Sequence, residues 1–282
     1  MRMTIGLILS SFFYAATAAA FPLPNGPRAL IQIPASLTRS YDFEGIVQLS
    51  NCSGSLIRLE NAKDSDLGLI LTNGHCYEGG FLRPGEFISH RRDSRSFVLM
   101  DSQGNEAATV TAREVLYATM TKTDMTIYQL DQTYGEILAQ TKVRAFTLSS
   151  QHPNLGQSIQ VVSGYWQRGY SCSIEAFVHQ LNEESWSFVD SIRYARPGCE
   201  VIGGTSGSPI ILNGTRTVIG INNTGNESGE KCTQNNPCEI DADGSVTFHK
   251  GYSYGQETFW IYSCVDSTGT FNLATPGCVL PH

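Results

Sequence analysis

Residues 203–209 read Gly-Gly-Thr-Ser-Gly-Ser-Pro, and the interpretation of the whole chain starts from this stretch. Glycines beside a serine leave the backbone uncovered and permit conformations that a side chain forbids. A serine hydroxyl is a weak nucleophile, so acyl transfer by Ser206 also needs a neighbouring base and N–H groups directed at the oxyanion. The N–H groups of Gly204 and Ser206 are the predicted oxyanion-hole donors. Taken alone, the stretch fits a glycine-rich turn between two strands equally well.

Two upstream segments contain the partners that a nucleophilic serine needs. Residues 72–76 read Thr-Asn-Gly-His-Cys and contain His75, and residues 123–127 read Thr-Asp-Met-Thr-Ile and contain Asp124. The order His, Asp, Ser along the chain is that of chymotrypsin, and it differs from the orders in subtilisin and the α/β-hydrolases. The hydrolase motif G-x-S-x-G also fails, because Ser208 occupies the position of its last glycine.

These three motifs carry a resemblance to a known family. The chain resembles the trypsin/chymotrypsin-like serine endopeptidases over about residues 45–260, and their secreted bacterial branch in particular. Gly-Thr-Ser-Gly-Ser-Pro at residues 204–209 stands where animal members have Gly-Asp-Ser-Gly-Gly-Pro. The resemblance implies an all-β fold of two antiparallel six-stranded β-barrels, with the active site in the cleft between them. The many short strands, frequent glycines and lack of a helical period are also typical of all-β barrels.

The resemblance implies a catalytic triad of His75, Asp124 and Ser206. In this family the aspartate is buried, accepts a hydrogen bond from the histidine ring and stabilises the imidazolium. Asp101 and Asp131 are the competing aspartates, but neither is followed by the alternating apolar pattern that follows Asp124.

The resemblance also implies a substrate pocket built from Glu200, Asn223 and Gly225. Glu200 lies six residues before the nucleophile, where a carboxylate would pair with arginine or lysine of a substrate. An exposed loop acid is the alternative interpretation of Glu200, and a pocket that favours glutamate also stays open. Animal members have an aspartate just before the nucleophile that pairs with a new N-terminus, but Thr205 stands there in this chain.

The eight cysteines, an even number, predict four disulfides and an oxidising compartment. The rival interpretation is structural zinc, for which the C-x₂-C ligand spacing is absent. Eight cysteines allow on the order of 100 pairings, and we expect nearest neighbours to pair. The family resemblance directly implies the first pair, which joins a strand to the cysteine after the catalytic histidine. The expected pairs are Cys52–Cys76, Cys172–Cys199, Cys232–Cys238 and Cys264–Cys278.

Apolar runs and turn residues place the strands. Strands are predicted at residues 46–50, 53–57, 67–72, 86–87, 96–100, 109–117, 125–130, 160–166, 175–179, 186–192, 209–212 and 217–222. The last two are expected to form a hairpin around Asn213 and Gly214. Residues 134–156 carry few strand signals and are expected to connect the two barrels.

The expected organisation has five parts. A positive residue, an apolar run and three alanines predict a signal peptide at residues 1–20, with an uncleaved anchor as the alternative. The proline-rich residues 21–40 are expected to be an extended lead-in or a short pro-segment. The N-terminal barrel with His75 and Asp124 is expected at 41–140, the C-terminal barrel with Ser206 at 155–260, and a disulfide-pinned tail at 261–282.

The net charge of the chain limits the classes of molecule that it is expected to bind. The formal net charge of −7 becomes −8 when residues 1–20 are removed, because Arg2 is the one charged residue in that segment. Nucleic-acid binding calls for a basic surface, so a nucleic acid is not an expected partner. The basic cluster at residues 90–95 is typical of a solvated loop face, and a grip on substrate or on an inhibitory segment is the alternative.

These observations together predict a secreted serine endopeptidase, extracellular or periplasmic. It is expected to be a monomer that acts on polypeptides, needs no cofactor or metal and has no membrane partner after signal cleavage. A protein inhibitor is a further expected partner. Two alternatives stay open: a catalytically idle protease-like binding protein, and a secreted esterase on the same scaffold.

Overall fold

Strands are the main regular elements of the computed structural model, which describes residues 41–282. The predicted signal peptide at 1–20 and the lead-in at 21–40 lie outside the described residues. Among the helices of the described part, none has the length and apolar character needed to cross a membrane.

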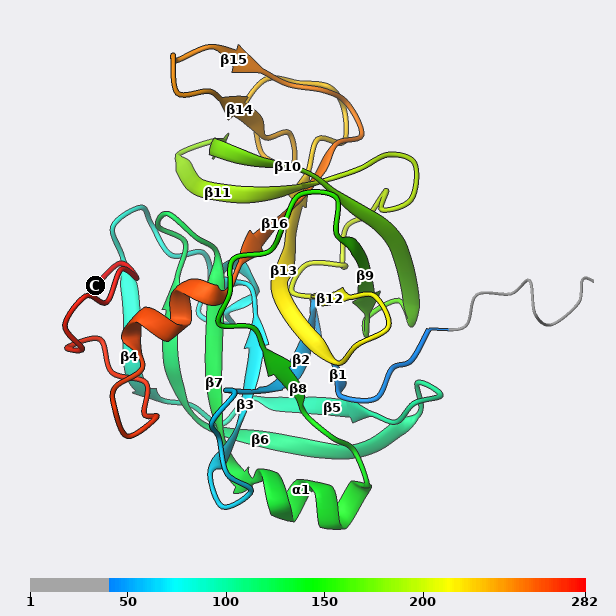
Figure 1. Ribbon diagram of the computed structural model, residues 1–282, viewed down its shortest axis with the longest axis vertical. Coiled ribbons are helices and arrows are strands. Elements are labelled where there is room, and N and C mark those ends of the chain that lie inside the picture. The colour runs from blue at the N-terminus through cyan, green and yellow to red at the C-terminus, as the bar shows by residue number, and fades with distance from the viewer. Residues whose placement is uncertain (1–40) are drawn as a thin grey trace, which may run out of the picture. The chain divides into compact units, whose positions relative to one another are not determined.

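The first barrel is a closed antiparallel cycle of six strands (Figure 1). The strands pair in the order β1-β5-β6-β7-β3-β2, and β1 pairs again with β2 to close the cycle. Apolar side chains on alternate positions fill the interior. The strands are β1 (Ile46–Gln48), β2 (Ser53–Arg58), β3 (Leu67–Thr72), β5 (Ser96–Met100), β6 (Glu106–Thr119) and β7 (Met125–Thr133), with β4 (Phe87–Arg92) paired to β6.

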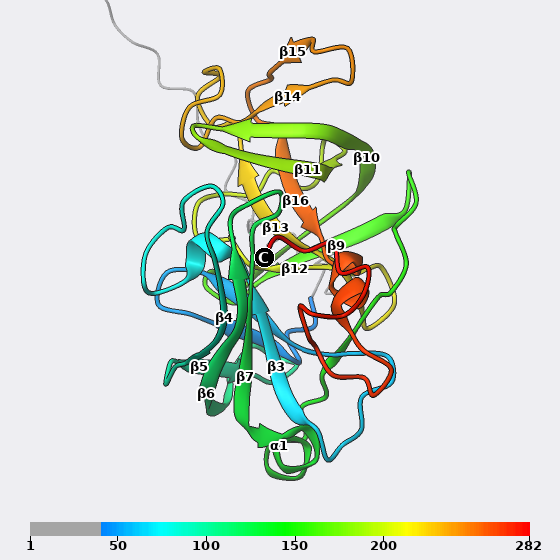
Figure 2. The same cartoon turned by 90° about the vertical axis from the view of Figure 1, so that its left-hand side faces the viewer.

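The second barrel is closed in the same way. Its strands pair in the order β13-β12-β9-β10-β11-β16, and β13 pairs with β16. They are β9 (Ser158–Ser163), β10 (Arg168–Glu183), β11 (Trp186–Tyr194), β12 (Pro209–Leu212), β13 (Thr217–Gly225) and β16 (Ser253–Glu257). Figure 2 shows β14 (Cys238–Ile240) and β15 (Val246–Thr247) extending this barrel on the side away from the first one. The predicted all-β fold with two six-stranded barrels is confirmed.

The connection between the barrels contains two elements that the sequence analysis did not predict. Helix α1 (Tyr134–Thr141) begins with a capping box, in which Thr133 and Glu136 each bond the other's backbone N–H. Strand β8 (Phe146–Leu148) then pairs in parallel with both β2 and β13, so it joins the two barrels through backbone hydrogen bonds. After β16, a 3₁₀ helix η3 (Phe259–Cys264) leads into the C-terminal segment.

Four disulfides cross-link the described chain, and they join the pairs that were expected. Cys232–Cys238 and Cys264–Cys278 close short segments. Cys172–Cys199 ties β10 to the chain that leads into the Ser206 loop.

Glu44 holds together three distant parts of the chain. Its carboxylate accepts hydrogen bonds from the Arg144 guanidinium at 2.9 and 2.7 Å and from Arg216 at 3.1 Å. The hydrogen bonds from Arg144, opposed by burial, lower the pKa of Glu44 from 4.5 to about 2. Because folding lowers this pKa, the network stabilises the fold above pH 4.5, and that stabilisation is lost as the pH falls towards 2.

Glu44→Gln is therefore expected to lower the free energy of unfolding at neutral pH by on the order of 1–3 kcal/mol, discounted because Arg144 is exposed. Urea unfolding of both proteins should show a difference that shrinks as the pH is lowered from about 7 to 3. Glu106→Gln, at an exposed position, is the control and should leave the midpoint unchanged. A Glu44→Gln effect that is the same at both pH values would contradict this role.

Candidate active site

His75 lies directly after the end of a buried strand. β3 ends at Thr72, and the chain then turns into the 3₁₀ helix η2 (Gly74–Cys76). A Cβ atom at Gly74 would lie 2.1 Å from the carbonyl oxygen of Thr119. The turn can therefore pack this closely against the end of β6 only with glycine before the histidine.

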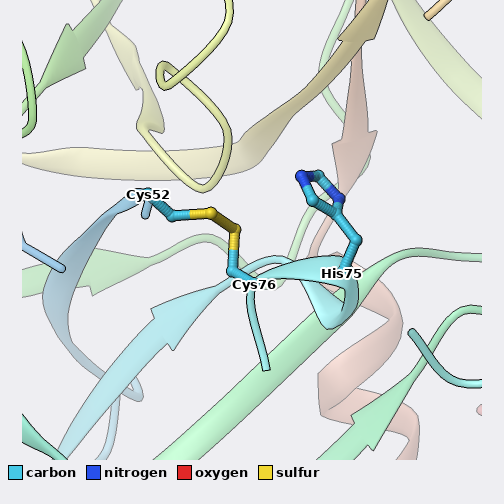
Figure 3. A group of neighbouring side chains, drawn as sticks. All are labelled: Cys52, His75 and Cys76. Atoms are coloured by element: carbon cyan, nitrogen blue, oxygen red, sulfur yellow. A yellow bond between two sulfur atoms is a disulfide. The ribbon is translucent and has the colours of Figure 1, made fainter. Parts of the chain in front are cut away.

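The disulfide between Cys52 and Cys76 anchors this turn to the loop before β2. Figure 3 shows the two joined sulfur atoms with the His75 ring beside them. Although these three residues lie close enough to hold a metal ion, both sulfur atoms are bonded to each other, so no thiolate is left as a ligand.

Asp124 is buried and makes two hydrogen bonds to His75. Its Oδ2 lies 2.6 Å from His75 Nδ1, and its Oδ1 accepts the backbone N–H of His75 at 2.9 Å. Asn73 donates its side-chain amide to the Asp124 carbonyl at 2.9 Å, which fixes the aspartate backbone. The structure thus brings together two of the three predicted triad residues.

Two effects act on the imidazole of His75. Burial disfavours its charged form, but the charge of Asp124, the hydrogen bond to Asp124 and the charge of Glu183 favour it. The net result raises the pKa of His75 above 6.5.

Backbone hydrogen bonds from both barrels hold the loop that carries Ser206. Ser53 in β2 donates its N–H to the Ser206 carbonyl at 2.8 Å, and Gly207 donates to the Asn222 carbonyl at 2.9 Å. Gly207 has φ of +78°, and a Cβ there would lie 2.2 Å from the Ser53 carbonyl oxygen. The glycine after Ser206 is therefore required by both its backbone conformation and its close approach to β2.

Thr205, in the position where animal relatives have an aspartate, is buried and hydrogen-bonded. The Asn222 side-chain amide donates to both Thr205 Oγ1 and the Thr205 carbonyl at 3.1 Å, and Thr205 Oγ1 donates to the Ile202 carbonyl at 2.6 Å. These contacts hold the loop from within the second barrel.

The Ser206 hydroxyl lies 3.5 Å from the Asn223 carbonyl oxygen. Within the described chain it makes no hydrogen bond to His75, but both side chains line the same cavity, together with Asp124. The N–H groups of Gly204 and Ser206 donate to no acceptor in residues 41–282. The Gly204 backbone has φ of +88°, a conformation that favours glycine.

The cavity has a volume of about 780 Å³ and is also lined by the three predicted pocket residues, Glu200, Asn223 and Gly225. The side chain of Glu200 is 48% exposed and has its own partners. Its Oε2 accepts the Gly198 N–H at 3.1 Å, and its Oε1 lies 3.7 Å from Arg196 Nε. Glu200 therefore lies at the wall of the cavity with part of its charge already compensated.

Glu183, at the end of β10, is a cavity residue that the sequence analysis missed. Its carboxylate accepts the Asn235 N–H at 2.7 Å. Burial raises the pKa of Glu183, opposed by a hydrogen bond from Thr224 and by the charge of His75. No motif marks this glutamate, because its place beside His75 arises only from the folding of β10 and β11 against the first barrel.

Arg95 corrects the interpretation of the basic cluster at residues 90–95 as a solvated loop face. Residues 90–92 are exposed, but Arg95 is only 5% exposed. It donates to the Cys76 carbonyl at 2.6 Å and to the Tyr128 hydroxyl at 3.1 Å. A buried guanidinium needs several acceptors, and the carbonyl beside His75 is one of them, so Arg95 helps to fix the histidine turn.

Comparison with the curated proteins gives no match. Among solved structures, the chain is similar to the MamO protease domain from Magnetospirillum magneticum in its apo form, with a TM-score of 0.49, 12% identity, and coverage of 80% of this chain and 98% of that one. It is also similar to the Rv3671c protease from M. tuberculosis in its active form, with a TM-score of 0.48, 12% identity, and coverage of 93% and 100%.

The family model described as "Trypsin-like peptidase domain" matches residues 52–221, which is more than half of the chain. The matched range contains His75, Asp124 and Ser206. This chain therefore belongs to the trypsin-like peptidase domain family.

Proposed function

We propose that this protein is a serine endopeptidase that hydrolyses polypeptides through an acyl-enzyme. The observation that carries the proposal is the buried Asp124 bonded to His75 in a cavity that Ser206 also lines. With Nδ1–H donated to Asp124, the neutral imidazole has its lone pair on Nε2, which is the atom that must accept the serine proton.

The proposed steps use residues of this chain alone. Ser206 Oγ attacks the scissile carbonyl while His75 takes its proton, and the Gly204 and Ser206 N–H groups bind the oxyanion. His75 then protonates the leaving amine, and water activated by the same imidazole releases the acyl group. The 3.5 Å contact between Ser206 Oγ and the Asn223 carbonyl is at the long limit for a hydrogen bond. A rotation of the serine side chain towards His75 therefore breaks only a weak hydrogen bond. Such catalytic hydrogen bonds commonly tighten only when substrate binds.

We further propose cleavage after arginine or lysine. The cavity wall carries the carboxylates of Glu183, Glu200 and Glu227 and the cations of Arg196 and Lys250. Arg196 pairs with Glu200, so acidic groups remain in excess when Asp124 is also counted. An acidic cavity favours a basic substrate side chain. Profiling a peptide library with the purified protein tests this preference, and a preference for cleavage after glutamate would contradict it.

The four disulfides indicate an oxidising compartment. We propose that residues 1–20 are a signal peptide and that the mature protein acts as a monomer outside the cell or in the periplasm.

Labelling with a serine-directed phosphonate, together with turnover of a peptide and a simple ester, tests the proposed activity. The endopeptidase should be labelled at Ser206 and should cleave peptides. No labelling would identify an idle binding protein, and ester turnover without peptide cleavage would identify an esterase.

The pH dependence of kcat/KM should report His75. Because the base must be neutral, kcat/KM is expected to fall as the pH decreases through a pKa above 6.5. Glu183→Gln removes a negative charge that favours the imidazolium, so it should move this pKa downwards. Profiles of both proteins between about pH 5 and 9 measure the change.

The matched control is Glu184→Gln, which changes the exposed neighbouring residue. It should leave the pKa in place. A rate that is unchanged at about pH 5 would remove His75 from the role of base.

A further inference from the structure

A second cluster of ionisable side chains lies away from the catalytic cavity. It consists of His152 in the connection before β9, Asp190 in β11 and Glu257 at the end of β16. The ligating atoms of these three side chains lie within 4.8 Å of one another. His152 Nε2 is 3.0 Å from Glu257 Oε1 and 3.3 Å from Asp190 Oδ2.

The tautomer of the neutral His152 ring is set by its other nitrogen. Nδ1 lies 2.6 Å from the Pro153 carbonyl oxygen, so Nδ1 carries the hydrogen and donates it. In the neutral ring Nε2 then carries the lone pair, and this nitrogen faces two carboxylate oxygens. While the ring is neutral, three acceptors face one another with no donor between them, so the site needs either a shared metal ion or a proton.

The burial of Glu257 strengthens the requirement for a cation at this cluster. Its side chain is 0% exposed, and neither carboxylate oxygen receives a hydrogen bond from a residue of the described chain. A buried carboxylate is normally paired, hydrogen-bonded or bound to a metal. Protons are the rival occupant, because burial and the neighbouring charge of Asp190 raise the pKa of Glu257 to about 9.

We propose that His152, Asp190 and Glu257 bind a divalent transition metal of the zinc class. Two ligands that each lie about 2.0–2.1 Å from one ion at a near-tetrahedral angle are separated by roughly 3.3 Å. The separations of 3.0 and 3.3 Å fit that geometry with little movement. An imidazole nitrogen with two carboxylates suits zinc, whereas calcium and magnesium prefer all-oxygen sites.

The surroundings fit a metal site in two further respects. The Pro153 carbonyl holds the non-ligating nitrogen of His152, the usual outer contact of a metal-bound histidine. The side chains of His152 and Asp190 are 40% and 33% exposed, so one side of the site is open for the ion to enter and for water to complete its coordination.

The metal would join three segments that are distant in the sequence. Glu257 pairs with Gly220 of β13, and β11 pairs with β16, so two ligands belong to the closed second barrel. The third ligand belongs to the connection from the first barrel. None of the three lines the catalytic cavity in the described chain, so the expected role is stabilisation of the fold. No metal was expected from the sequence because the C-x₂-C spacing of zinc sites is absent, and these three ligands follow no such motif.

The test uses the untagged, disulfide-bonded protein, treated with a chelator and then dialysed into metal-free buffer near neutral pH. Calorimetric titration with zinc chloride should show one ion per chain. The Tm should rise by roughly 5–10 °C when free zinc exceeds the dissociation constant about 100-fold. Calcium chloride should produce no such rise. Cobalt should give a visible absorption band that requires the His152 ligand.

His152→Ala and Asp190→Asn should each abolish the zinc-dependent rise in Tm and the cobalt band. Both side chains are partly exposed, so these two variants are expected to fold. They can therefore test the proposal even if Glu257→Gln fails to fold. His249→Ala, at an exposed histidine elsewhere in the second barrel, is the control and should keep the full response. A wild-type protein that binds no zinc would overturn the proposal and leave protons as the occupant. A zinc response that survives in both ligand variants would also overturn it.

Discussion

Ser206→Ala is expected to lower kcat by about 10⁴-fold or more, with little change in stability. The substitution removes one oxygen atom at a half-exposed position, and the backbone contacts that shape the loop do not involve that oxygen. The variant should therefore fold and bind substrate but form no acyl-enzyme. A residual rate above that in water is expected, because the oxyanion donors and the cavity remain.

Steady-state and burst-phase kinetics on a peptide substrate measure this effect. Ser208→Ala is the matched control in the same loop, since the buried Ser208 hydroxyl has no hydrogen-bond partner among the described residues. It should keep near wild-type activity. Full activity in Ser206→Ala would remove Ser206 from the mechanism.

Asp124→Asn is expected to lower kcat by about 10⁴-fold at neutral pH. The backbone N–H of His75 donates to Asp124 Oδ1, so the amide oxygen of an asparagine would stay at that position. Its NH₂ group would then occupy the position of Oδ2, 2.6 Å from His75 Nδ1, and would donate to that nitrogen. The hydrogen of the neutral imidazole would be forced onto Nε2, where it blocks acceptance of the serine proton.

This prediction is tested by pairing kinetics with nitrogen-resolved NMR of the His75 ring, which reports the tautomer directly. Asp131→Asn is the control, because Asp131 is exposed in β7 and was one of the two competing aspartates in the sequence. It should leave both kcat and the tautomer unchanged. An Asp124→Asn protein that keeps Nδ1–H and high activity would contradict the proposed role of Asp124.

Strands were predictable where burial dominates the local pattern. The run at residues 67–72 and the run at 96–100 coincide with β3 and β5. Continuous or alternating apolar residues over such a short length are typical of strands with one or both faces buried. Helix α1 was missed, although Thr133 and Glu136 form a capping box that could have marked its start. β8 and β16 were missed for a different reason. β8 is short, the interior of β16 is Tyr-Gly-Gln rather than an apolar run, and both are held by pairing with distant strands.

The sequence by itself determined the family, the all-β class and the residues proposed for the chemistry. These features depend on short motifs and on apolar patterns that can be recognised within a few neighbouring residues. The cysteine pairs were a nearest-neighbour expectation that only the structure confirmed. Only the tertiary structure decided that Glu183 faces His75, that Arg95 is buried beside the histidine turn, and that His152, Asp190 and Glu257 converge. Each of these contacts joins side chains from strands or loops that are far apart in the chain. Their energies depend on distance and burial, which exist only once both barrels have closed.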